Sequence, residues 1–171
     1  MFHSAQKALN AKQAAKGGLI DGVAKTQYDY SKKENISGRY INYVMSLAYS
    51  CSEVNASMGK ICASPTAGSC GIVPAVLLGL SQAKNISREK TLEGLITASA
   101  VGAIYTKNAT VAGADGGCQA ECGVARSMAA AAAAYMMGAD DDKCLDAEFT
   151  KNLNTLLKLV FLLKLGTSGT D

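Results

Sequence analysis

The sequence has no tryptophan, only two prolines, a single histidine and 6% aromatic residues among its 171 residues. The one histidine, His3, lies near the start of the chain, which argues against catalytic arrangements of the Ser-His-Asp or Cys-His type. No run of about 18 apolar residues occurs, so we expect no membrane-spanning helix. The first residues are polar and alanine-rich without an apolar run, so we expect no secretory signal.

Charge is also sparse, with 18% charged residues, 49% hydrophobic residues and a net charge of +3. The lysines are scattered and are not interleaved with aromatic residues, which excludes a nucleic-acid surface as the expected function. Six cysteines in a chain without a secretory signal indicate reduced thiols and a cytoplasmic protein. Four of them have no recognisable ligand spacing and are interpreted as small packing residues: Cys51, Cys62, Cys70 and Cys144.

Alanine and glycine are abundant, which indicates closely packed helices. Apolar residues recur at helical spacing, and no segment alternates as a strand would. The prediction is a mainly α, compact multi-helix domain that spans residues 1–171, with glycine-rich loops at helix N-termini. The expected helices cover residues 2–16, 39–53, 72–83, 89–105, 119–137 and 143–165, and residues 19–35 are expected to be a loop.

Residues 147–171 form an atypical C-terminal tail. Its leucines make a dense apolar stripe that is broken only by Lys158 and Lys164, and small polar residues follow from Gly166. A helix this apolar needs a partner surface. The helix expected over residues 72–83 is apolar on nearly every side, so we expect it at the centre of the fold.

Two glycine-rich stretches, residues 64–80 and 113–123, lead directly into apolar helical segments. The first holds both prolines, and Pro74 suits the first turn of a helix. Free N–H groups at a helix start attract a carboxylate or phosphate. The second stretch places Cys118 at a helix start, where the helix dipole favours the thiolate that binds metals. Together they predict an anion-binding loop beside a metal-binding thiol.

Neighbouring residues leave alternatives open. Cys122 is four residues after Cys118 and could face the same metal, although a buried packing role is favoured. Glu121 could be a second ligand, a base, or an acceptor for nearby backbone N–H groups. The loop and the lysines also suggest pyridoxal phosphate, but the helical class disfavours that cofactor. A Walker loop is excluded because no Gly-Lys-Ser/Thr occurs.

The chain resembles the α chain, or catalytic domain, of the bacterial iron–sulfur L-serine dehydratases, also called L-serine deaminases. The resemblance covers roughly Gly18 to Leu145. Four motifs carry it in order: Asn-Ala-Ser-Met-Gly at 55–59, Ser-Pro-Thr-Ala-Gly-Ser at 64–69, Gly-Ile-Val-Pro at 71–74 and Gly-Gly-Cys-Gln-Ala-Glu at 116–121. It implies a lyase of amino-acid catabolism and gluconeogenesis. Such a lyase converts L-serine to pyruvate and ammonia with a 4Fe–4S cluster as Lewis acid and without pyridoxal phosphate.

The resemblance also implies roles for individual residues. Cys118 stands where the family has its first cluster cysteine. We expect the N–H groups of residues 66–69 to hold the serine carboxylate, assisted by the hydroxyls of Thr66 and Ser69, and the α-proton base is not identified. A separate β chain, a homo-oligomer, or both are implied as partners. The substrate-binding candidates are Asn55, Ser57, Gly59, Ser64, Thr66, Ala67, Gly68 and Ser69.

The sequence departs from the family pattern after about residue 146, as a truncation or frameshift would make it do. The family's further cluster cysteines lie in a Cys-Asp-Pro and a Pro-Cys stretch, whereas residues 156–171 contain neither cysteine nor proline. A 4Fe–4S cluster is held by several thiolates, so its ligand set is incomplete in this sequence. The alternative function is a non-catalytic helical remnant of the same family.

Overall fold

The computed structural model describes residues 1–15, 17, 18 and 20–147. These residues form a mainly α structure, as predicted, and their only β pairing is one bridge between Ala14 and Asp21. Within the described residues, no helix is both long and apolar enough to cross a membrane. The helices are α1 (Phe2–Asn10), α2 (Val23–Ser31), α3 (Arg39–Ala56), α4 (Ile72–Lys84), α5 (Arg88–Asn108) and α6 (Gly113–Met136), and residues 141–147 are also helical.

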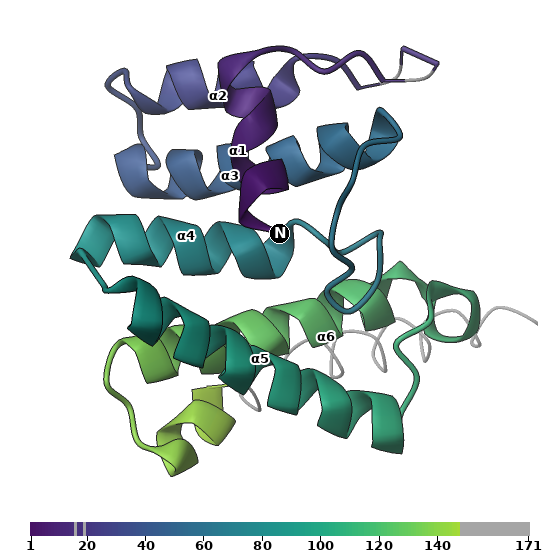
Figure 1. Ribbon diagram of the computed structural model, residues 1–171, viewed down its shortest axis with the longest axis vertical. Coiled ribbons are helices and arrows are strands. Elements are labelled where there is room, and N and C mark those ends of the chain that lie inside the picture. Colours follow the sequence, from purple (N-terminus) through teal and green to yellow (C-terminus); the bar gives the residue numbers. More distant parts are fainter. Residues whose placement is uncertain (16, 19, 148–171) are drawn as a thin grey trace, which may run out of the picture.

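Helix α4 lies between two groups of helices, with α1, α2 and α3 on one side and α5 and α6 on the other (Figure 1). Its Val73 and Leu77 are fully buried against residues of α5 and α6. Its Ala75 belongs to a second buried cluster with residues of α1, α2 and α3. The expectation of a central position for this helix, drawn from its apolar residues on every side, is therefore confirmed.

Helices α5 and α6 approach closely because small residues line their contact. A Cβ atom added at Gly94 would lie 2.7 Å from Cγ of Met136, and one added at Gly102 would lie 2.9 Å from Cε of Met128. Ala131 and Ala132 on α6 are fully buried in the same core cluster. The alanine-rich run therefore serves helix packing, in agreement with the sequence.

Helix α2 corrects the prediction of a loop over residues 19–35. It buries Ala24, whose backbone N–H donates a hydrogen bond of 2.8 Å to Oε1 of Glu53 on α3. The residue that precedes α2, Gly22, has no side chain to cap the helix. Because the capping acceptor comes from a distant part of the chain, the local sequence gave no helix-start signal for this segment.

Other boundaries differ less from the prediction. Helix α1 ends at Asn10 rather than at residue 16, and α3 continues to Ala56 rather than 53. Helix α4 begins at Ile72 with Pro74 in its first turn, as expected. Ser87 caps α5, because its side chain accepts a hydrogen bond of 3.1 Å from the N–H of Lys90.

The region after α6 agrees with the sequence as far as it is described. Oδ1 of Asp140 accepts a hydrogen bond of 2.9 Å from the N–H of Lys143, which caps the helical residues 141–147. The rest of the helix expected over residues 143–165 lies outside the described residues. The same holds for the predicted tail from residue 148 onward.

Candidate functional site

The cradle loop, which we define as residues 64–71, precedes α4 and is closed by one buried hydroxyl. Ser69 is 1% exposed, and its Oγ donates to the carbonyl of Ser64 at 3.2 Å. The same oxygen lies 3.1 Å from Oγ1 of Thr66 and accepts from the Thr66 N–H at 3.4 Å. The side chain of Ser69 therefore fixes the shape of the loop.

Successive backbone amides of the cradle loop are left without acceptors. The N–H groups of Ala67, Gly68 and Ser69 donate to no acceptor within the described part of the chain, whereas that of Thr66 is engaged by Ser69. The first turn of α4 follows directly, so its partial positive charge adds to these donors. Such a cluster of amides can bind a carboxylate or phosphate.

Of the predicted site residues in the 55–59 motif, one makes a hydrogen bond to the cradle loop and two bond within the end of α3. Asn55, in the last turn of α3, donates from Nδ2 to the carbonyl of Ala67 at 3.4 Å. Ser57 donates to the carbonyl of Glu53 at 2.7 Å, and the N–H of Gly59 donates to the carbonyl of Val54 at 2.8 Å. Asn55 thus contacts the predicted site, while Ser57 and Gly59 make hydrogen bonds that end α3.

The second glycine-rich stretch contains a break in the helix directly before Cys118. Gly117 has φ 72° and ψ 175° inside α6, so Cys118 begins the continuous part of that helix. The preceding residues, from Gly113, form a helical turn of their own. The Cys118 side chain is exposed at this break.

Glu121 joins the two glycine-rich stretches. Its Oε1 accepts a hydrogen bond of 3.2 Å from the N–H of Gly113. Its Oε2 lies so close to Gly68 that a Cβ atom there would be 2.5 Å away. Of the alternatives for Glu121, the structure therefore shows the backbone acceptor. The contact with the cradle loop was not foreseen, because only the absence of a side chain at Gly68 signals it.

The thiols near the break do not make a complete cluster site. The sulfur atoms of Cys118 and Cys122 are 3.8 Å apart, and burial together with the Cys118 thiol raises the pKa of Cys122. Within the described residues, no group of three or more Cys, His, Asp or Glu side chains could hold a metal ion. Since a 4Fe–4S cluster is held by Cys thiolates, typically four, these residues do not fit the whole group.

The six thiols should separate by their reactivity with a disulfide reagent at mildly alkaline pH. Cys62 and Cys118 are exposed and should react first. Because Cys62 is exposed, its interpretation as a packing residue is wrong. Cys51 is buried, and burial raises its pKa to about 11, so it should react only after unfolding. Mass spectrometry of the modified peptides measures the order, and early labelling of Cys51 would contradict the structure.

The family model described as "Serine dehydratase alpha chain" matches residues 1–153. The chain belongs to this family. The match begins before Gly18 and ends beyond Leu145, so the family resemblance is wider than the four motifs indicate.

Members of the serine dehydratase alpha chain family with curated names are similar over most of this chain. The "L-serine dehydratase, alpha chain" of Peptoniphilus asaccharolyticus is 45% identical over 157 residues, which are 91% of this chain and 54% of that protein. The "Probable L-serine dehydratase, alpha chain" of Bacillus subtilis is 39% identical over 160 residues, 94% of this chain and 53% of that protein. "L-serine dehydratase 2" of Escherichia coli is 38% identical over 116 residues, 67% of this chain and 26% of that protein. The chain therefore spans about half the length of the α chains that it matches.

Proposed function

We propose that this chain provides the L-serine-binding part of an iron–sulfur L-serine dehydratase, a lyase that forms pyruvate and ammonia. One observation carries the proposal: consecutive amides of the cradle loop, from Ala67 to Ser69, lack acceptors among the described residues. These amides lie next to Glu121, which is on the same helix as Cys118. The names of the relatives supply the substrate, and "alpha chain" in two of them indicates an assembly with a β chain.

In this proposal the loop binds and orients the amino acid. The N–H groups of Ala67 and Gly68 donate to the serine carboxylate, and the Thr66 hydroxyl turns from Oγ of Ser69 to give one further hydrogen bond. Ser69 acts indirectly, because its buried hydroxyl is used to hold the loop. Oε2 of Glu121 accepts no hydrogen bond from the described residues and lies against Gly68, where it suits the substrate's ammonium group.

For the 4Fe–4S cluster, this chain would supply a single ligand. We propose that Cys118 contributes one thiolate and that the remaining thiolate ligands come from outside this sequence, whose other cysteines, all within the described residues, show no cluster-binding arrangement. Anaerobic treatment of the chain with iron and sulfide, in the presence of its β chain, tests this part. A brown protein that forms pyruvate supports it, and loss of the colour in Cys118→Ser supports the assigned ligand. A colourless, inert protein supports the helical-remnant alternative.

The role of the loop is tested by replacing Thr66 with valine, which keeps the shape of the side chain but removes its hydroxyl. We expect the L-serine concentration for half-saturation to rise about tenfold, since a hydrogen bond to a charged group is lost. Calorimetric titration of the chain with L-serine measures it. Thr97→Val is the matched control, because Thr97 hydrogen-bonds only within α5. Equal serine binding by Thr66→Val and the unmodified chain would contradict the proposed role.

A further inference from the structure

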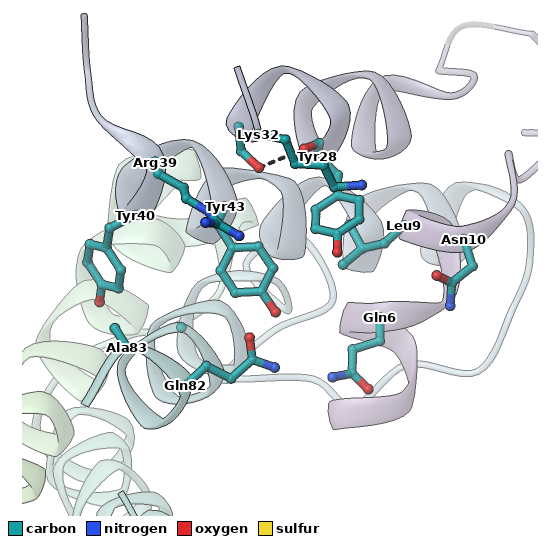
Figure 2. Close-up of a pocket in the computed structure, with 12 residues that line it drawn as sticks. Gln6, Leu9, Asn10, Tyr28, Lys32, Arg39, Tyr40, Tyr43, Gln82 and Ala83 are labelled. Carbon is teal, nitrogen blue, oxygen red and sulfur yellow. Dashed lines mark hydrogen bonds between the residues drawn. The ribbon is translucent and has the colours of Figure 1, made fainter. Parts of the chain in front are cut away.

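A cavity of about 660 Å³ lies among the first four helices (Figure 2). Its wall includes Arg39 and Tyr43 from α3 and Gln82 from α4. Arg39 begins α3, whereas Asn55 at the other end of that helix contacts the cradle loop. At a rise of about 1.5 Å per residue the two ends are about 24 Å apart, so this cavity is distinct from the serine site. Its volume is within the range of small-molecule sites.

The charge of the cavity wall has one sign. No aspartate or glutamate lines it, whereas Lys32 and Arg39 both do. Asp29 pairs with Lys32 at 3.3 Å, and the Lys32 ammonium lies 3.9 Å from the centre of the Tyr28 ring. Arg39, by contrast, makes no hydrogen bond or ion pair with any described residue. The cavity therefore contains a guanidinium group that is available to an anion.

Residues 1–40, which supply most of the cavity wall, carry an excess of positive charge in the sequence. Residues 1–40 contain seven lysines and arginines but three aspartates and glutamates, an excess larger than the net charge of +3 of the whole chain. Lys32 and Arg39 are the two cationic side chains that line the cavity, and Lys32 is already paired with Asp29. Arg39 is therefore the expected contact for a negatively charged group.

The remaining wall is aromatic and amide-bearing. The Tyr28 and Tyr43 ring centroids are 5.9 Å apart with an interplanar angle of 53°, and Tyr40 adds a third ring. Figure 2 shows Gln82 reaching from α4 towards the hydroxyl end of Tyr43. Tyrosine rings provide apolar area for a flat organic group, while the amide offers both a donor and an acceptor.

We infer that this cavity binds a small organic anion, whose phosphate or carboxylate pairs with Arg39 and whose apolar body lies against the tyrosine rings. This inference does not depend on the proposed serine dehydratase function. Because the cavity and the cradle loop lie at opposite ends of the same two helices, a ligand here leaves the serine site open.

The test compares three probes by calorimetry with the full chain. Adenosine monophosphate presents a phosphate, phenylpyruvate presents a carboxylate, and adenosine is the matched neutral compound. We expect submillimolar binding of at least one anion and weaker binding of adenosine. Arg39→Gln should weaken anion binding about tenfold, since a charge-assisted hydrogen bond is lost. Lys33→Gln is the matched control, because that neighbouring lysine does not line the cavity.

The Arg39 variant should keep its fold. Arg39 is in the first turn of α3, where a positive charge is unfavourable, so its removal does not weaken the helix. Binding that is equally strong in Arg39→Gln would overturn the inference, as would anions that bind no better than adenosine. Chemical-shift changes at Tyr43 and Gln82 on titration would support this location. Changes confined to residues 67–69 would place the anion at the cradle loop and overturn it.

Discussion

Replacing Glu53 with alanine is expected to lower the free energy of unfolding by about 2–3 kcal/mol. Glu53 is 0% exposed, and its Oε1 accepts the N–H of Ala24 at 2.8 Å. Alanine would leave that N–H unpaired in the interior and a cavity the size of the lost side chain. Part of the loss is offset, because Oε2 of Glu53 has no partner among the described residues and its burial is itself costly.

The effect of Glu53→Ala should be concentrated in α2. Hydrogen exchange at Ala24 and the following turn should become faster, while the packed α5–α6 pair keeps its protection. Urea unfolding measures the global change. Glu53→Gln retains an acceptor for Ala24 and should lose less stability, and Glu34→Ala, at an exposed position, should lose almost none. Equal stabilities of Glu53→Ala and Glu34→Ala would show that Glu53 does not hold α2 in place.

Glu53 also shows why part of the fold could not be predicted from the sequence. The central place of α4 follows from its own composition, because a helix with apolar residues on every side must be covered on every side. The start of α2 has no such local signal, because its cap comes from a glutamate on α3. A pattern within a segment reveals which face is buried, but it does not reveal a partner brought by the tertiary fold.

In the candidate site, too, some features depend on one segment of the chain and others depend on how separate segments pack together. The cradle loop is constrained by its own residues, because the buried Ser69 hydroxyl bonds within the loop, so its place before α4 could be predicted from the glycines and prolines of that stretch. The position of Glu121 beside Gly68 depends on how α6 packs against the loop, and no spacing rule predicts it. The cavity at Arg39 was missed for a similar reason, because its wall comes from four separate helices.

Replacing Gly71 with alanine is the second change for which we expect a large effect, a loss of about 1–3 kcal/mol in the free energy of unfolding. Gly71 has φ −86° and ψ −21°, which any residue adopts, so the backbone conformation costs nothing. A Cβ atom there would lie 2.7 Å from the carbonyl oxygen and 3.2 Å from Cα of Ala48 on α3. Both are backbone atoms, so no side-chain rotation relieves the contact and α4 must move away from α3.

A matched pair on the same two helices distinguishes this effect from general overpacking. Gly79→Ala also adds a Cβ between α4 and α3, but its nearest neighbour is the side chain of Val44. Val44→Ala should therefore rescue Gly79→Ala, whereas Ala48→Gly cannot rescue Gly71→Ala, and a double-mutant cycle in urea measures both couplings. Because Gly71 ends the cradle loop, its variant should also bind L-serine more weakly, while the rescued Gly79 variant should not. Normal stability in Gly71→Ala would mean that α3 and α4 do not approach as closely as this contact requires.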